Sequence, residues 1–376
     1  MKKYFFVIII LITAAFVFYS CSKSGGDSDP YNPPAGFDKS AMLQNYADNL
    51  IIPGYAALQQ KITAFQTSAD AFLAAPSASL QDQVKLTYKE LYLQYERVAA
   101  FQFGPAETEL LDIFLNYSGG LDYNFNTAGE LTGFSVDSVN IEKNILSGTY
   151  NLTTMNRASF YSQGFPAIGY IFFGPNAIAK FSTNNAARVK YAKDVITRMK
   201  TLVDKVVAAW PTYKTDFVSN TKTNVGSPIG NIVNQLAYQM DLLKGPRIGW
   251  PFGKQSNGTV FASKTESYFT GNSAQLAAEN ITALKNTYAG GGNGKGISDY
   301  LVSLSKTTLN NDILAQFDIV ISKLKLIPDP LSAALTTQPD LVENAYKEIQ
   351  KLLTLLKTDL ASATAVQISY MDNDGD

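Results

Sequence analysis

The sequence contains no histidine among its 376 residues and has a single cysteine, Cys21. Because histidine is the commonest general base and the commonest neutral metal ligand, its absence excludes Ser-His and Cys-His catalytic arrangements. One cysteine cannot form an intramolecular disulfide. The formal net charge is only −1, so no excess of basic residues indicates binding to nucleic acid.

The composition is typical of a well-packed globular protein. Hydrophobic residues make up 46 % of the chain and charged residues 17 %, which argues against intrinsic disorder. A single hydrophobic core seldom keeps growing beyond about 250–300 residues. The length therefore predicts two domains.

The N-terminal segment has the pattern of an export signal. Two lysines at positions 2 and 3 precede an apolar stretch at residues 5–18, which is too short for a comfortable transmembrane helix. We therefore expect residues 1–20 to be a signal peptide.

Cys21 follows a small residue, Ser20, as at the cleavage site of a bacterial lipoprotein. A polar segment rich in Gly, Ser and Pro comes next, and it predicts a flexible tether at residues 21–37. We expect a lipid on Cys21 that anchors the protein in the cell envelope, at the outer membrane, on either its periplasmic or its outer face. An ordinary signal peptide with an incidental cysteine is the alternative.

Most of the remaining chain has the periodicity of amphipathic helices. Apolar residues recur at a spacing near 3.6 in six stretches, which are residues 55–72, 84–98, 189–210, 232–243, 276–288 and 341–360. Strand-like alternation is scarce, so we predict an all-α protein of helical bundles. Ser79 with Asp82 is an expected helix start, and Ser227 before Pro228 is another.

Two long segments, residues 117–140 and 245–272, are polar, contain several glycines and lack periodicity. They predict long loops. Loops of this length in a compact domain are often functional.

Several short stretches resemble known motifs, but each lacks a residue that the motif requires. The glycine run ends in Gly296 where a phosphate-binding loop needs Ser or Thr. The closing DNDGD at residues 372–376 stops before the glutamate of a calcium loop. Two S-x-x-K strings, at 303–306 and 322–325, lack their companion motifs. The residues alone indicate no reaction.

The apolar stretch GFPAIGYIFFG at residues 164–174 lacks side-chain metal ligands at two positions where a helix could carry them. Pro166 and Gly169 are three residues apart, and such positions lie on one face of a helix. Metal ligands would fit there, but proline and glycine have no side-chain donor. Because proline disfavours helical geometry at Phe165, we expect the helix to begin at Pro166.

Five stretches together carry a family resemblance by their order and spacing: YADNLIIPGYAAL (46–58), YERVAAFQFGPAE (95–107), QGFPAIGYIFFG (163–174), RIGWPFG (247–253) and ESYFTGNSAQLAAENITALKNTY (266–288). With the closing DNDGD they resemble the imelysin family, bacterial envelope proteins classed with the M75 peptidases and often linked to iron uptake. The resemblance covers essentially the whole mature chain.

The resemblance implies two helical bundles with a functional groove between them, which we expect at residues 38–182 and 183–376. It also implies a site built around a G-x-H-x-x-E motif. Gly164 is kept here, whereas Pro166 stands at the histidine position and Gly169 at the glutamate position. Because neither can ligate, we expect no metal, no cofactor and no catalytic residue at this motif.

Five further residues are expected to line the groove: Tyr92, Glu96, Arg247, Glu266 and Ser273. Glu96 lies four residues after Tyr92 and eight after Tyr88, so the three share a helix face. The alternative is that Glu96 is a solvated helix acid and Arg247 a loop charge.

The resemblance favours a non-catalytic binding accessory in iron or haem uptake, with an outer-membrane uptake receptor or another envelope protein as partner. A histidine-independent peptidase or other hydrolase is the first alternative. A purely structural envelope protein is the second.

Overall fold

The computed structural model describes residues 36–117, 124–125, 131–132, 136–182, 185–292 and 294–370. The signal peptide, Cys21, most of the expected tether and the closing DNDGD lie outside the described residues. None of the helices in the described part of the chain combines the length and apolarity needed to cross a bilayer.

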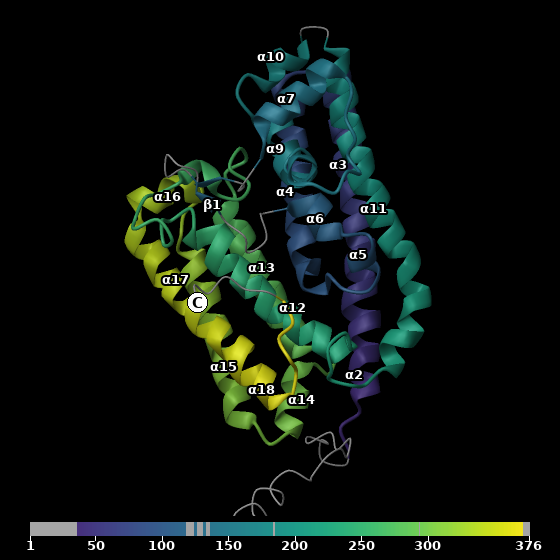
Figure 1. The fold of residues 1–376 in the computed structure, drawn as a ribbon, viewed down its shortest axis with the longest axis vertical. Helices are drawn as coiled ribbons and strands as arrows, with labels where there is room; N and C mark the ends of the chain where they lie inside the picture. The colour runs from purple at the N-terminus through teal and green to yellow at the C-terminus, as the bar shows by residue number, and fades with distance from the viewer. Residues whose placement is uncertain are drawn as a thin grey trace, which may run out of the picture.

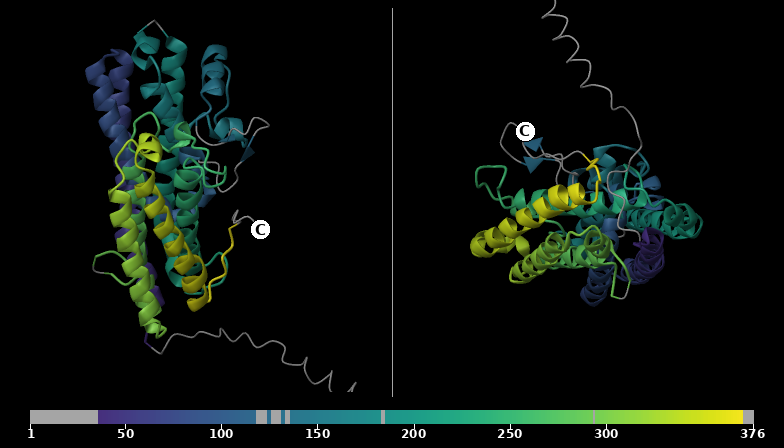
Figure 2. Two further views of the ribbon diagram at one scale, coloured as in Figure 1. Left: turned by 90° about the vertical axis from the view of Figure 1, so that its left-hand side faces the viewer. Right: turned by 90° about the horizontal axis from the view of Figure 1, so that it is seen from below.

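The fold is all-α, as the periodicity predicts, with one short antiparallel strand pair. Its helices form two elongated groups that lie side by side (Figure 1). Most of the long helices run roughly along the long axis of the molecule, as the further views in Figure 2 show. We call α2–α11 the first helical group and α12–α18 the second.

The elements of the first helical group are α2 (Lys39–Asn45), η1 (Tyr46–Ile51), α3 (Ile52–Ala74), α4 (Ala78–Val98), η2 (Ala99–Phe101), α5 (Pro105–Thr108), α6 (Leu111–Asn116), β1 (Asn124–Phe125), β2 (Leu131–Thr132), α7 (Ser138–Ser147), α8 (Arg157–Phe160), α9 (Gly164–Phe173), α10 (Ala177–Ser182) and α11 (Ala186–Ser219). Those of the second are α12 (Pro228–Leu242), η3 (Leu243–Gly249), η4 (Ala262–Lys264), α13 (Ser273–Ala289), α14 (Ile297–Ser303), α15 (Thr307–Lys325), α16 (Leu331–Thr337), α17 (Pro339–Thr354), η5 (Leu355–Leu360) and α18 (Ala361–Ala363).

The apolar stripes read from the sequence form the core. Phe65 of α3, Tyr88 of α4, Trp210 of α11 and Leu284 of α13 are all buried, and they belong to one hydrophobic cluster that runs through both groups. α11 follows the bundle boundary expected at residues 182 and 183, yet it packs against α3 and α9. The helices packed around α3 therefore extend to the end of α11.

Two of the helix starts differ from the expected ones. Ser227 caps α12 as predicted, since its hydroxyl accepts the Gly230 N–H at 3.2 Å. The start predicted at Ser79 is wrong, because Ser77 is the N-cap of α4 and accepts the Leu80 N–H. α9 begins at Gly164 rather than at Pro166. Pro166 lies in its first turn, where backbone N–H groups have no helical partner and a proline costs little.

The two groups meet along α4 and α13, which pack directly against each other, and η2 extends this contact to α12. The segment between η3 and α13 contacts α4 through Glu266 and Tyr92. This junction brings the expected groove residues together.

Candidate functional site

Three side chains of α4 that are spaced four residues apart face the junction. Tyr88, Tyr92 and Glu96 are 1 %, 1 % and 0 % exposed. The expectation that they share one helix face is confirmed. The alternative of Glu96 as a solvated acid is wrong, because α13 and η3 cover the end of α4.

A pocket of about 260 Å³ opens beside Tyr88 and Tyr92. We call it the motif pocket, because Pro166 and Gly169 of α9 both contribute to its wall. Its lining residues are Tyr88, Tyr92, Asn116, Tyr117, Val136, Ser138, Pro166, Gly169, Arg247, Ser263, Lys264, Thr265, Glu266, Ser267, Tyr268 and Phe269. Residues 166 and 169 therefore face a cavity with aromatic side chains in its wall.

Gly164 fixes how α9 enters the site. Its φ is +70°, in the left-handed region that favours glycine. A Cβ at this position would overlap the backbone carbonyl of Leu115 at the end of α6. Glycine thus lets α9 approach α6 closely, which holds the next turn against the pocket.

Side chains of α4 lie directly against α9 beside the pocket. A Cβ at residue 169 would lie 3.3 Å from the Tyr88 hydroxyl, which itself donates to the Phe165 carbonyl at 3.0 Å. The ring of Phe165 stacks on Tyr92 with centroids 4.0 Å apart. α9 is therefore fixed against α4 by aromatic packing and a buried hydrogen bond, without any metal ligand.

Arg247 is not a loop charge. It lies in η3, a widened helical turn that also contains Pro246, and its side chain is 4 % exposed. The segment expected to be a loop from residue 245 thus begins only after Gly249. Widened turns of this kind are frequent at functional sites.

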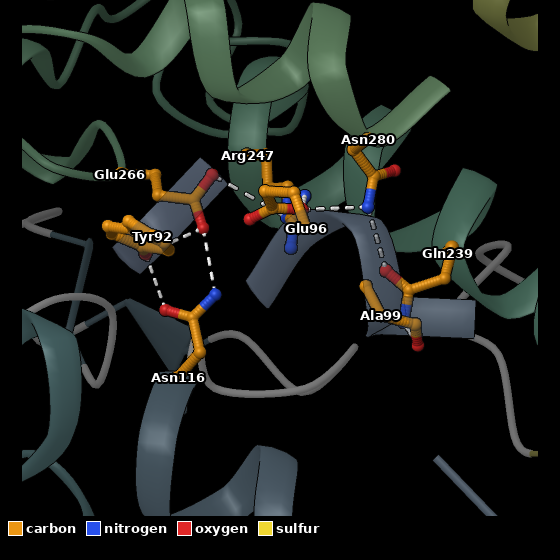
Figure 3. A network of polar contacts seen from close by, with 8 residues as sticks. All are labelled: Tyr92, Glu96, Ala99, Asn116, Gln239, Arg247, Glu266 and Asn280. Atoms are coloured by element: carbon orange, nitrogen blue, oxygen red, sulfur yellow. Dashed lines mark hydrogen bonds and ion pairs between the residues drawn. The ribbon is translucent and has the colours of Figure 1, made fainter. Parts of the chain in front are cut away.

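Two carboxylates from different elements surround the Arg247 guanidinium (Figure 3). Its Nη1 donates to Glu96 Oε2 at 2.7 Å, and its Nε lies 3.7 Å from Glu266 Oε2. All three side chains are at least nine-tenths buried. Each ionised group in this buried row depends on its neighbours, because a lone buried charge is costly.

The carboxylates are held from both sides by neutral groups. Glu266 Oε1 accepts from the Tyr92 hydroxyl at 2.9 Å and from Asn116 Nδ2 at 3.0 Å. Glu96 Oε2 also accepts from Asn280 Nδ2 at 2.8 Å. The Asn116 and Asn280 contributions have no signal in the sequence, since each is an amide within an ordinary helical pattern.

A further amide extends the network into α12. Gln239 Nε2 donates to the Ala99 carbonyl at 3.0 Å, and its Oε1 lies 3.3 Å from Asn280 Nδ2. Glu96 Oε1 remains buried without a hydrogen-bond partner. The row of polar groups in Figure 3 therefore links α4, α6, α12, α13 and η3.

Burial dominates the acid–base properties of the network. It raises the pKa of Glu96 to about 7, against the opposing effect of the Arg247 charge. Burial alone would lower the pKa of Arg247, but Glu266 and Glu96 raise it above its ordinary value. Burial also raises the pKa of Tyr92 well above its usual range. At neutral pH the arginine is therefore charged and Tyr92 is a neutral phenol.

Ser273 lies beside this network rather than in the motif pocket. It is the first residue of α13, and its hydroxyl donates to the backbone carbonyl of Glu266. Its contact is with the main chain, so it positions the segment that carries Glu266. Of the five expected groove residues, the structure places Tyr92, Arg247 and Glu266 in the pocket wall, with Glu96 and Ser273 behind it.

The residues present do not fit a metal ion at the motif. Pro166 and Gly169 supply no donor. Glu266 is the carboxylate in the pocket wall, and the Arg247 cation against it would repel a metal ion. Within the described ranges, no three acidic, histidine or cysteine side chains gather as a metal site would require.

The motif pocket has two neighbouring pockets along the junction, and successive pockets share wall residues. The central pocket, of about 260 Å³, shares Asn116, Tyr117 and Arg247 with it. A third pocket, of about 480 Å³, shares Asp112, Ile113 and Tyr238 with the central pocket. We call this third one the carboxylate pocket. The three pockets lie in a row between the two helical groups, and we call this row the groove.

Solved structures with this architecture exist. One is described as an iron-regulated protein A precursor from Parabacteroides distasonis ATCC 8503, with a TM-score of 0.71 and 18 % identity, over 90 % of this chain and 98 % of that one. Another is an imelysin-like protein from Psychrobacter arcticum 273-4, with a TM-score of 0.65 and 13 % identity, over 89 % and 97 %. At these identities the likeness concerns the fold.

The sequence itself matches the model of the imelysin family, peptidase M75, over residues 51–360. The chain therefore belongs to the imelysin family, as the resemblance predicts. A search of curated proteins finds no match.

Proposed function

We propose that this protein is a non-catalytic binding accessory of the bacterial cell envelope that serves iron or haem uptake. The observation that carries the proposal is the motif pocket: its shape is kept by Gly164 and α9, while residues 166 and 169 have no reactive or ligating side chain. A cavity whose wall lacks reactive groups at residues 166 and 169 supports binding rather than turnover.

The link to iron comes from relatives. A protein described as an iron-regulated protein A precursor has the same fold as this chain. Small-molecule pockets usually measure about 300–1,000 Å³. Because the motif pocket is smaller, at about 260 Å³, a ligand of ordinary size would extend from it into the central pocket past Arg247.

The geometry does not favour the hydrolase alternative. Glu96, with its pKa near 7, has the acidity of a general base, but a base must reach the proton that it removes. Glu96 is fully buried and lines none of the three pockets. Purified protein incubated with unfolded polypeptides is expected to show no cleavage above a boiled control.

Titration calorimetry with haemin and with ferric citrate tests the binding role. We expect saturable binding of one of the two to wild type. Binding should be lost in Gly169→Trp, which fills the motif pocket, and retained in Gly292→Trp at an exposed loop position. Absence of binding by both compounds, or equal binding by the two variants, would contradict the proposal.

The cell-envelope location has its own test. Lipidated Cys21 would place the protein in the membrane fraction, and two or three acyl chains hold a protein firmly. We expect Cys21→Ala to release it into the soluble fraction. In addition, a deletion strain should grow normally with ample iron and slowly under iron limitation. Wild-type protein found soluble after signal cleavage would rule out the anchor.

A further inference from the structure

The carboxylate pocket is a second polar cavity at the other end of the groove, and it has no lining residue in common with the motif pocket. One side comes from the segment around α5 and α6, and the other from α12 and the C-terminal segment after α18. Its volume of about 480 Å³ is within the range of small-molecule sites.

The charged groups in this wall are of one sign. Glu107 and Asp112 contribute carboxylates, and no lysine or arginine among the described residues lines the pocket. Lys357 lies beyond the pocket wall, 5.9 Å from the ring centroid of Tyr370, and pairs with Asp241 at 3.5 Å. Its charge is therefore already compensated by another acid.

Asp112 is the deeper of the two acids. Its Oδ1 accepts the Ile113 N–H at 2.8 Å, which is a contact within its own helix. Burial raises the pKa of Asp112 above its ordinary value, and the nearby Glu107 adds to this effect. A carboxylate in such a position gains from an opposite charge placed in the cavity.

Amide groups in the same wall are left without partners. Gln102 is 7 % exposed, and neither its Oε1 nor its Nε2 has a hydrogen-bond partner. Gln235 donates to the Gln102 carbonyl at 3.3 Å, but its own Oε1 is buried and unpartnered. Buried polar atoms are nearly always satisfied in folded proteins. A polar ligand in the pocket can supply the missing partners when these side chains rotate toward it.

We propose that the carboxylate pocket binds an organic cation that ends in a guanidinium or primary ammonium group. Such a group brings positive charge and several N–H donors, which match the carboxylates of Glu107 and Asp112 and the amide oxygens of Gln102 and Gln235. The Tyr238 ring in the same wall offers an aromatic face for the cation. The inference goes beyond the proposed function and stands without it.

A pair of isosteric probes tests the charge requirement. Nα-acetyl-L-arginine amide carries a guanidinium, whereas Nα-acetyl-L-citrulline amide has the same shape with a neutral urea. Calorimetry should show saturable binding of the arginine probe and at least tenfold weaker binding of the citrulline probe. Nα-acetyl-L-lysine amide then distinguishes a guanidinium from an ammonium preference. The Gln102 side-chain amide resonance, assigned with Gln102→Leu, should shift on binding.

Variants locate the site. Asp112→Asn should weaken binding of the arginine probe at least tenfold, and Glu107→Gln, at the exposed rim, about two- to fivefold. Asp312→Asn, an exposed acid on α15, is the matched control and should bind like wild type. If Asp112→Asn does not fold, Glu107→Gln and Gln102→Leu still report on the pocket.

Several results would overturn the inference. Equal binding of the arginine and citrulline probes would show that charge is not recognised. Binding unaffected by the Asp112 and Glu107 changes would place the probe elsewhere. Binding of Mg²⁺ or Ca²⁺ alone, without the organic probes, would assign the carboxylates to a metal ion instead.

Discussion

Nη1 of Arg247 lies 2.7 Å from Oε2 of Glu96, and the two side chains are 4 % and 0 % exposed. One residue comes from the second helical group and the other from α4 of the first. A buried pair of this kind gives a modest net stabilisation, yet removal of one member leaves an uncompensated charge in a low-dielectric interior.

We therefore expect Arg247→Ala to be strongly destabilising. The free energy of unfolding should fall by about 3–5 kcal/mol, the usual cost of breaking a buried ion pair on one side. Lys61→Ala is the control, because Lys61 pairs with Glu90 at 2.8 Å on the surface with both side chains at least 40 % exposed; it should change stability by about 0–1 kcal/mol. Urea denaturation measures both, and similar losses would contradict the prediction.

The raised pKa of Glu96 predicts a pH dependence of stability. The folded protein holds a proton on Glu96 up to about pH 7, whereas the unfolded chain releases it near 4.3. Folding is therefore favoured by this group at low pH, and the advantage is lost as pH rises from about 4.3 to about 7. Each pKa unit of difference between the folded and unfolded states changes the free energy of unfolding by about 1.4 kcal/mol.

The measurement compares wild type with Glu96→Gln. The stability of wild type relative to the variant should be higher at pH 5 than at pH 8, since glutamine has no proton to lose. Parallel pH profiles for the two proteins would show that Glu96 is already ionised in the fold at pH 5.

Two glycines with similar positive φ values allow steric fit to be separated from the backbone preference for glycine. Gly164 and Gly148 have φ values of +70° and +67°, but a Cβ would overlap the Leu115 carbonyl at the first and meet nothing within 4 Å at the second. Gly164→Ala should lower the free energy of unfolding by at least about 2 kcal/mol more than Gly148→Ala. Thermal denaturation measures the difference, and equal losses would mean that α9 can shift away from α6.

Reinstating the motif tests whether the pocket kept its shape. Pro166→His with Gly169→Glu should fold, with a stability loss of no more than about 1–2 kcal/mol, since Tyr88 is the neighbour that must yield. The double variant should bind zinc only weakly, because it supplies two ligands and the Arg247 cation beside Glu266 in the wall opposes the ion. Each single variant should bind far less. If calorimetry finds that the double variant binds zinc no better than wild type, the side chains at residues 166 and 169 do not face the same space.

Much of the fold follows from the sequence because helical periodicity reports burial directly. Phe65, Trp210 and Leu284 lie on the predicted stripes, and all three are fully buried. The exact ends of the helices are harder to predict from the sequence. Ser77 and Ser79 are both plausible caps, and only the backbone of Ser77 is extended. α11 also shows that the place where a helix packs depends on long-range contacts that periodicity does not encode.

The site follows from the sequence only in part. Tyr88, Tyr92 and Glu96 share a face by their spacing, and residues 166 and 169 do so as well. The burial of Glu96 depends on η3 and α13, which are more than a hundred residues away. Asn116, Gln239 and Asn280 are amides without any local pattern, and the pairing of Arg247 with two acids arises only when both helical groups are packed.

The polar row across the junction has a consequence for how a ligand enters. Glu96 bonds to Arg247 and Asn280, Gln239 bonds to Ala99, and Tyr46 of η1 donates to the Thr287 carbonyl at 2.7 Å. A hinge motion that parted the two groups would break all of these contacts and leave charges unpaired. These contacts hold the two groups in a fixed relative position, so we expect a ligand to enter through local side-chain movement rather than through hinge opening of the two groups.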